Sequence, residues 1–331
     1  MDTVLRKKYF QTLEKEIETL VSSKTGLLDR KYSKIINCPL CNSRPSYHKN
    51  LFVKNGYTFV RCDNCEMIFT NPQVKQELLD ELYGKSEAND IWMKIQKSEK
   101  EKSWKRNYYF DLLELIGKFN KKKKPKLLDI GCSIGYFLEL VREYKPNWLS
   151  EGLEVNDEAY KYATRKGLKV EKKFLNEVDI NNKYDIFSML GLLEHLSNPK
   201  NIIEGIKKHS KDGSLVLVVV PNAYSLYHMF IQGKSVSFDG RNHLLYFSEK
   251  TLRRLFEDNG FKVLSLDTVL TGIDNIENQI QWFDPYDSKE KTDRFVPKSI
   301  KHFFTNGQVE DFIYKHNLGL RLRLLAKWKR K

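Results

Sequence analysis

The sequence predicts an α/β fold in which helices cover a mainly parallel sheet, preceded by a small metal-binding segment. Two observations lead to this prediction. Apolar strand segments alternate with amphipathic helices from residue 126 onwards, and four of the five cysteines form two Cys-x-x-C pairs near the N-terminus. A chain of 331 residues is long enough for one large domain with additions, or for two domains.

Short apolar segments in the C-terminal two thirds have the composition of buried strands. Strands are expected at 126–131, 149–155, 170–174, 184–190, 214–220 and 261–269, and helices at 136–144, 157–166, 199–210 and 248–259. Leucine and arginine alternate over residues 320–324, which favours a seventh strand; the other interpretation is a basic membrane-surface helix over 318–331. Residues 271–317 then form an insertion before the last strand.

The N-terminal part has a different pattern. Apolar residues spaced by three and four predict an amphipathic helix over 3–21, and a polar, helical region continues to about residue 119. We therefore divide the chain into an N-terminal helix (1–35), a zinc-binding module (36–75), a helical linker or cap (76–120) and the α/β domain (121–331).

Composition excludes a disordered or fibrous chain, since 40% of residues are hydrophobic and 30% are charged. The formal charge of +14 arises from lysines scattered along the chain, and the run at 121–124 reads as a solvated linker or as a phosphate-attracting patch. Neither a signal peptide nor an apolar run of membrane-spanning length is visible, so we expect a cytoplasmic protein.

The strongest functional signal lies at residues 127–141. A strand ends in a turn of small residues that opens a helix, so backbone N–H groups can approach the carboxylate of a ligand. Glu154 ends the next strand, a position from which a carboxylate can accept both ribose hydroxyls. The turn reads Asp129-x-Gly131-x-Ser133-x-Gly135, which differs from the glycine spacing of a nicotinamide-dinucleotide site.

This turn resembles motif I of the class I S-adenosylmethionine-dependent methyltransferases, and residues 152–155, 183–199, 217–222 and 243–248 resemble later motifs of that family. The resemblance implies a Rossmann-like sheet of six parallel strands and one antiparallel strand, with S-adenosylmethionine as cofactor. The cofactor-binding residues it implies are Asp129, Gly131, Cys132, Ser133, Gly135, Tyr136, Phe137, Glu154, Val155, Phe174 and Leu190. Ser133 departs from the family pattern, which more often has glycine there. Another doubly wound domain is the alternative.

The cysteines predict a structural zinc site. Cys38, Cys41, Cys62 and Cys65 form two pairs separated by a stretch that suits a hairpin, and tetrahedral Zn²⁺ takes four thiolates. Disulfides are uncommon in the cytoplasm, and a redox pair needs only one such motif. We interpret His48 as a surface residue and not a ligand, and Cys132 as a small residue of the cofactor turn.

Histidines are the candidates for chemistry on the substrate. His243 is interpreted as a general base or as an anchor for its loop, and His195, which the resemblance places near the cofactor, as a second catalytic candidate or as loop support. Some relatives bind a divalent metal near this pair, but Gly191 stands where one of their acids would be, so metal-dependent catalysis is not expected. Aromatic residues of the same region either line the acceptor site or pack within a lid over it: Tyr224, Tyr227, Phe230 and Phe238.

Zinc knuckles ahead of such a domain resemble methyltransferases of sugar-nucleotide and surface-polysaccharide biosynthesis. The N-terminal half resembles the sugar C-methyltransferases of this group, but those enzymes carry a further C-terminal domain. We therefore expect O-methylation of a sugar hydroxyl on a small-molecule or glycan substrate, such as a sugar nucleotide, with a sugar C-methyltransferase as the alternative. A third hypothesis is an RNA methyltransferase, but no Asn-Pro-Pro-Tyr motif follows the fourth strand and the zinc segment lacks a basic aromatic patch. A non-catalytic module that retains the fold is a fourth. The N-terminal helix could contribute to a homodimer.

Overall fold

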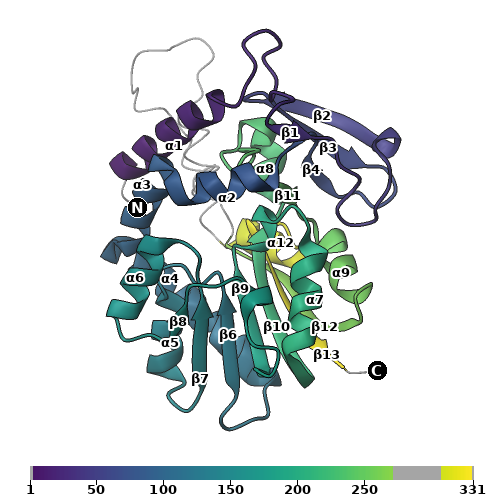
Figure 1. Ribbon diagram of the computed structural model, residues 1–331. Coiled ribbons are helices and arrows are strands. Elements are labelled where there is room, and N and C mark those ends of the chain that lie inside the picture. Colours follow the sequence, from purple (N-terminus) through teal and green to yellow (C-terminus); the bar gives the residue numbers. More distant parts are fainter. Residues whose placement is uncertain (1–2, 271–306, 330–331) are drawn as a thin grey trace.

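A seven-stranded sheet forms the centre of the molecule, with the strand order β12-β13-β10-β9-β6-β7-β8 (Figure 1). The computed structural model describes residues 3–270 and 307–329, so most of the predicted insertion lies outside the described residues. The strands are β6 (Lys126–Ile130), β7 (Leu149–Leu153), β8 (Val170–Glu171), β9 (Tyr184–Leu190), β10 (Ser210–Pro221), β12 (Phe261–Val269) and β13 (Arg321–Trp328).

The direction of the last strand confirms the predicted fold. β13 runs antiparallel to both of its neighbours, β10 and β12, while the pairs between β10, β9, β6, β7 and β8 are all parallel. The sheet therefore has six parallel strands and one antiparallel strand, and the alternating leucines of the C-terminus belong to a strand and not to a membrane-surface helix.

The predicted bounds of five strands need correction. β6 ends one residue early, at Ile130, and β7 two residues early, at Leu153. β8 ends at Glu171, before the expected Phe174, because the backbone N–H of Phe174 donates to Glu177 at 2.6 Å and starts a short 3-10 helix, η2 (Leu175–Glu177). β10 begins four residues early, with an irregular register between Ser210 and Leu215. β13 continues to Trp328, where it pairs with Phe261.

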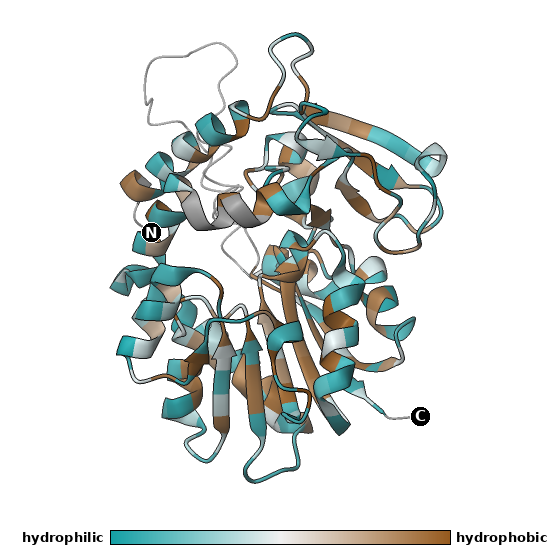
Figure 2. Cartoon of the chain, viewed as in Figure 1, coloured by the Kyte–Doolittle hydropathy of each residue, from teal (hydrophilic) through white to brown (hydrophobic). Residues whose placement is uncertain are grey.

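Helices cover both faces of the sheet, and Figure 2 shows the strands between them as largely hydrophobic. On one face, α7 (Pro199–His209) and α9 (Glu249–Glu257) pack on a core that includes Leu128 and Val218. On the other, α4 (Glu99–Phe119) and α5 (Tyr136–Tyr144) pack on a core that includes Leu127 and Leu217. Successive residues of one strand serve opposite faces, as a pleated strand requires. α6 (Asp157–Arg165) follows β7.

The N-terminal residues form a second layer of structure. α1 (Thr3–Glu18) is shorter than the predicted helix and packs near α3 (Glu87–Lys97), which follows α2 (Gln76–Lys85). β2 (His48–Lys54) and β3 (Tyr57–Cys62) form the hairpin expected between the cysteine pairs, and β4 (Ile68–Thr70) pairs with β3. β1 (Ser33–Lys34) pairs with β5 (Gln73–Val74). A role for α1 in a dimer stays a prediction.

The small sheet is completed by a strand from far along the chain. β11 (Leu245–Tyr246) pairs with β4, which gives a four-stranded sheet in the order β11-β4-β3-β2. Figure 1 shows this sheet and helices α1 to α3 above the end of the large sheet at which the parallel strands finish. α8 (Leu226–Ile231) and α12 (Gln308–Lys315) complete the described helices. Among the described residues, no helix is long and apolar enough to span a bilayer.

Candidate functional site

The turn after β6 adopts a conformation that favours glycine. Gly131, Ser133 and Gly135 have φ angles of 72°, 51° and 75°, all in the left-handed region. The backbone N–H of Gly131 donates to the carbonyl of Leu153 at 2.9 Å, which fixes the turn on the end of β7. Gly135 is the N-cap residue of α5, so the turn leads directly into the positive end of that helix.

The strand beneath the turn has no room for a side chain. A Cβ atom at Gly152 would lie 2.6 Å from Sγ of Cys132 and 2.8 Å from Cδ1 of Leu138. Cys132 is buried, and burial raises the pKa of its thiol well above the usual value, so the thiolate is not the stable form. These contacts agree with the interpretation of Cys132 as a small residue that fills the turn.

Two buried carboxylates flank the turn. Glu154 accepts the backbone N–H of Ser133 at 2.8 Å and that of Asn156 at 2.7 Å, while burial raises its pKa. Asp129 is 2% exposed, and burial raises its pKa to about 7, although a hydrogen bond from Ser188 Oγ at 2.6 Å favours the ionised form. The charge of Glu154 raises the pKa of Asp129 further. The site therefore holds strong negative potential in a low-dielectric setting.

A cavity opens beside this turn. Its walls include seven of the predicted cofactor residues: Asp129, Gly131, Cys132, Ser133, Tyr136, Phe137 and Leu190. The remaining four, Gly135, Glu154, Val155 and Phe174, are not among its lining residues. Glu154 still contacts the turn through Ser133, whereas the side chain of Phe174 is 54% exposed. The structure thus brings most of the predicted set together, and the cofactor-binding role of every residue in it stays a prediction.

The two candidate histidines, 48 positions apart in the sequence, lie in contact. The ring centroids of His195 and His243 are 4.9 Å apart. Nδ1 of His195 donates to the carbonyl of Asn242 at 2.8 Å, and Nδ1 of His243 donates to the carbonyl of Ser237 at 2.9 Å. Because a carbonyl only accepts, both rings carry their proton on Nδ1 when neutral, and Nε2 has the lone pair. Burial lowers the pKa of His195.

The segment that leads to His195 contacts the cofactor turn. His195 belongs to η3 (Leu193–His195), which follows β9, and a Cβ atom at Gly131 would lie 3.1 Å from Cδ1 of Leu192 in the segment between them. Leu190, two residues earlier, lines the cavity. His195 therefore follows by three residues a side chain that contacts the turn, and neither histidine is among the lining residues of the cavity.

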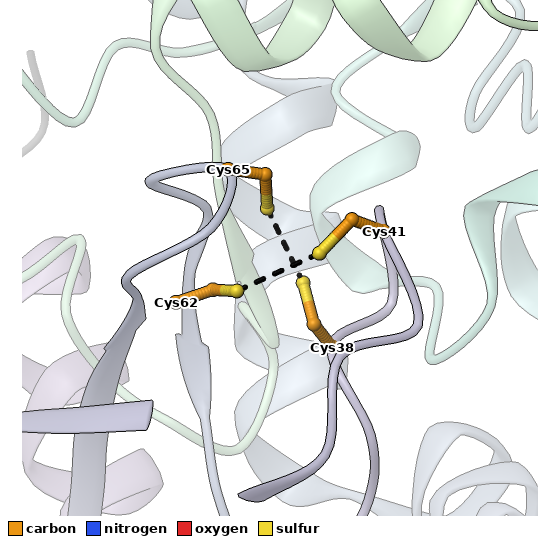
Figure 3. A group of neighbouring side chains, drawn as sticks. All are labelled: Cys38, Cys41, Cys62 and Cys65. Atoms are coloured by element: carbon orange, nitrogen blue, oxygen red, sulfur yellow. Dashed lines mark hydrogen bonds between the residues drawn. The ribbon is translucent and has the colours of Figure 1, made fainter. Parts of the chain in front are cut away.

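The four cysteine side chains converge on a common centre, as Figure 3 shows. Sγ of Cys38 lies 3.4 Å from Sγ of Cys65, Sγ of Cys41 lies 3.6 Å from Sγ of Cys62, and all four sulfurs lie within 4.8 Å of one another. Tetrahedral Zn²⁺ with bonds of about 2.3 Å separates its sulfur ligands by about 3.8 Å. The thiol set therefore fits that ion without a change of backbone.

Residues 102–266 match a family model described as a methyltransferase domain, and this match covers the glycine turn, the histidine pair and every lining residue of the cavity except Gln96.

The chain is an S-adenosylmethionine-dependent methyltransferase.

Relatives of the methyltransferase include two uncharacterized proteins of Methanocaldococcus jannaschii. MJ1123 is 25% identical over 177 residues, covering 51% of this chain and 83% of its own length. MJ0638 is 28% identical over 155 residues, covering 47% of this chain and 63% of its own length. Among solved structures, the plantazolicin methyltransferase BpumL in complex with SAH is 16% identical, with a TM-score of 0.49 and coverage of 77% of this chain and 99% of its own.

Sequence reasoning missed the part of the methyltransferase that closes the cavity from the N-terminal side. Gln96 on α3, and Lys105 and Tyr109 on α4, line the same cavity as the glycine turn. Lys105 Nζ contacts Gln96 Oε1 and lies 3.5 Å from Glu101, while burial lowers the pKa of Lys105 to about 8. In the sequence, a lysine on a charged helix reads as solvated, so no local signal marks it.

His48 is half-buried and hydrogen-bonded within the cysteine segment of the methyltransferase. Its Nε2 contacts the carbonyl of Ser43 at 3.1 Å, and its Nδ1 contacts Nδ2 of Asn71 at 3.1 Å. Both ring nitrogens therefore have partners other than a metal. The expectation that His48 is no zinc ligand agrees with this geometry, and its side chain is partly exposed, as expected of a residue near the surface.

Two aromatic residues of the covering region lie in different surroundings. Phe238 is 4% exposed, stacks on Tyr246 with centroids 4.8 Å apart, and meets Phe59 edge-on. It packs the junction between the small sheet and the loop that carries His243. Phe230 is 66% exposed, so it does not pack in the core, and it is not among the lining residues of the cavity.

Proposed function

We propose that the methyltransferase transfers the methyl group of S-adenosylmethionine to a hydroxyl oxygen of a sugar, carried on a nucleotide or on a surface-polysaccharide precursor. The observation that carries this proposal is the contact between the two histidines, one of which follows the segment that contacts the cofactor turn. An alcohol is a poor nucleophile until it loses its proton, and two neutral imidazoles with Nδ1 tied to carbonyls present Nε2 as the basic atom.

The cofactor site is proposed from the residues around the turn. S-adenosylmethionine supplies an electrophilic methyl group on a sulfonium. Asp129 would attract the ammonium group of the methionine part, and Lys105, which also lines the cavity, its carboxylate. Glu154 would exchange its backbone N–H partners for the ribose hydroxyls. Val155 and Phe174 would flank the adenine.

On the acceptor side, we assign proton removal to His243 and orientation of the acceptor to His195. His243 is 22% exposed in its side chain, and Asp239 Oδ2 lies 3.6 Å from its Nδ1, so the imidazolium that forms on proton transfer is stabilised. Burial lowers the pKa of His195, which favours its neutral form and suits a hydrogen-bond acceptor.

Buried polar atoms near this pair support a polar acceptor. Tyr108 Oη, Glu194 Oε2 and His228 Nε2 are buried and have no hydrogen-bond partner among the described residues. Burial raises the pKa of Tyr108, and Glu194 contributes to that rise; burial also lowers the pKa of His228 to about 4, and nearby His243 contributes. Unpaired buried donors and acceptors favour a ligand that carries several hydroxyls, because such a ligand supplies the missing hydrogen bonds.

We further propose that the four cysteines bind one structural Zn²⁺. The support is the fit of the four sulfurs to a closed tetrahedral site. Such a site has no open position for a substrate, so its contribution is to the stability of the small sheet and to the placement of β4 against β11.

The decisive experiment incubates the purified protein with methyl-labelled S-adenosylmethionine and a panel of nucleotide sugars, followed by mass spectrometry and NMR of the product. We expect label on a sugar oxygen, and His243→Ala to lower kcat about 100-fold while cofactor affinity stays the same. Label on a sugar carbon would instead establish the C-methyltransferase alternative. Label on RNA, together with salt-sensitive RNA binding, would overturn the sugar proposal.

A further inference from the structure

An arginine without an ion-pair partner lies at the edge of the large sheet that carries the cofactor turn. Arg321 begins β13 and pairs with Pro221, the last residue of β10. The strands β10, β9 and β6 are parallel and finish at this edge, and ligands of such sheets bind beyond the carboxyl ends of the strands. In the described part of the chain, the half-buried side chain of Arg321 makes neither an ion pair nor a hydrogen bond. Its guanidinium is therefore available to a ligand.

A second arginine on the same strand is engaged in the structure. Nε and Nη2 of Arg323 donate to the two carboxylate oxygens of Asp267, at 2.8 and 2.7 Å. Leu322 and Leu324 pack in the core beneath α7 and α9, and successive residues of a strand face opposite sides. Arg321 and Arg323 therefore face the side of the sheet that α4 covers, and of these two it is Arg321 that has no carboxylate.

The hydroxyl of Tyr108, on α4, lies near these arginines. Burial raises the pKa of Tyr108, while the charges of Arg321 and Arg323 oppose that rise. The charge of Glu194 adds to it, so all of these charged side chains lie within electrostatic reach of the phenol. Oη of Tyr108 is buried and has no hydrogen-bond partner among the described residues. A buried hydroxyl without a partner is costly, and a ligand that accepts its proton removes that cost.

Arg321 and Glu194 lie close to the same small residue. A Cβ atom at Gly191 would be 3.9 Å from Nη1 of Arg321 and 3.5 Å from Oε1 of Glu194. Within the described residues the two side chains do not form an ion pair, and Oε2 of Glu194, a residue that is 2% exposed, has no hydrogen-bond partner. Gly191 directly follows Leu190, which lines the cofactor cavity, whereas Arg321 is not among the lining residues. The two unpaired groups thus lie beside the cofactor cavity and not inside it.

A ligand that satisfies both groups carries an anion and a hydroxyl. A guanidinium presents parallel N–H donors that match a carboxylate or a phosphate, and a carboxylate oxygen accepts a hydroxyl proton. We propose that Arg321 and Tyr108 bind an anionic group of the acceptor, a carboxylate or a phosphate, while Glu194 accepts one of its hydroxyl groups. The identity of this ligand as the methyl acceptor rests on the proposed function. The acceptor class is thereby narrowed to sugars that carry a negative charge.

The first experiment measures anion binding without methyl transfer. The full chain with its zinc is saturated with S-adenosylhomocysteine, so that no added anion occupies the place of the cofactor carboxylate. It is then titrated by calorimetry with inorganic pyrophosphate, with D-glucuronate and with D-glucose. We expect binding of at least one of the anions and none of glucose. Glucuronate alone would assign a sugar carboxylate, pyrophosphate alone would assign the phosphate of a carrier, and binding of both would support the shared chemistry.

Variants test whether the anion binds at the proposed residues. We expect affinity to fall at least about 10-fold in Arg321→Gln and several-fold in Tyr108→Phe, with an intermediate loss in Arg321→Lys, which retains the charge but not the paired donors. Arg323→Gln removes the same charge from the same face of the same strand, so it is the matched control and retains the affinity. The affinity of each variant for S-adenosylhomocysteine reports that it is folded.

The second experiment measures kinetics with the acceptor that the nucleotide-sugar panel identifies. Arg321→Gln should raise KM for this acceptor at least about 10-fold, with little change in the affinity for S-adenosylmethionine. The inference is overturned if neither anion binds to the cofactor-bound protein, or if Arg321→Gln binds them equally. If anions bind through Arg321 but no sugar is methylated, the anion site stands and the sugar proposal fails. If a sugar is methylated with the same KM by both proteins, the proposed function stands and this inference fails.

Discussion

Asp129 is a residue at which function and stability oppose each other. In the folded chain its pKa is about 7, above the ordinary value of 3.8, so the folded state resists ionisation of this group. Its contribution to the free energy of unfolding therefore falls, by at most about 4 kcal/mol, as pH rises from about 4 to about 7. Above pH 7 this contribution is constant.

We predict that Asp129→Asn stabilises the cofactor-free protein at pH 8. Asparagine does not titrate, and its Oδ1 can still accept the hydroxyl of Ser188. Urea denaturation from pH 4 to pH 8 should show a stability difference that is small at pH 4 and greatest above pH 7. Calorimetry at pH 8 should show weaker S-adenosylmethionine binding by the variant. A stability difference independent of pH would contradict this account.

Ser133 is the point at which the chain departs from the family pattern. Its φ of 51° places a non-glycine residue in the left-handed region, which costs about 1 kcal/mol or more. We predict that Ser133→Gly raises the free energy of unfolding by about 0.5–1 kcal/mol, after the greater entropy of unfolded glycine is counted. Ser133→Ala retains the strain and serves as the control. Equal stability of the three proteins would show that the turn is not strained.

At the scale of elements, α1 is connected to the loop of His243 by a buried ion pair. Arg241 is 2% exposed and contacts Glu16 of α1, and Glu16 also accepts the Ser86 hydroxyl at 2.7 Å and the backbone N–H of Ala88 at 3.1 Å. These bonds hold the pKa of Glu16 below its usual value although burial opposes them. The pair fixes the helix, α3 and the active-site loop together.

We predict that Arg241→Met destabilises the protein by about 3–5 kcal/mol, because it leaves a carboxylate in a partly buried position without its cation. Glu16→Gln in the same chain should recover part of this loss. Chemical denaturation of the two single variants and the double variant measures the coupling. Additive losses would mean that the two side chains do not act as a pair.

The elements that the sequence predicts best have clear end signals. The bounds of β12 match the prediction at both ends, and α5 begins and ends where glycine and the apolar spacing place it. β11 could not be predicted, since a two-residue strand has no periodicity and its partner β4 lies far away in the sequence. The contact between His195 and His243 could not be predicted either, because it depends on how two loops that are distant in the sequence pack against each other.

At the scale of the whole molecule, the cysteine segment is part of the main core. Cys38, Cys62 and Cys65 belong to the same buried cluster as Leu128 of β6 and Phe256 of α9. An ion held by the cysteines therefore supports the sheet that carries the cofactor turn, in addition to the small sheet itself.

We predict that removal of zinc with a strong chelator lowers the midpoint of thermal unfolding of the whole chain by roughly 10 °C or more. Release of one Zn²⁺ per chain is measured with a colorimetric indicator, and unfolding by calorimetry. Cys65→Ser should reproduce the loss, whereas Cys132→Ser, which alters a cysteine outside the cluster, should retain the zinc. An unchanged midpoint in the metal-free protein would show that the cysteine segment unfolds independently.

The pairing of β11 with β4 also constrains the order in which the protein can fold during synthesis. The first three strands of the small sheet leave the ribosome early, but the strand that covers the edge of β4 is residues 245–246. Until then β4 presents unpaired backbone groups, and an uncovered edge is prone to pair with another chain. The N-terminal segment is therefore the part of the nascent chain most in need of protection, although it is the first to be made.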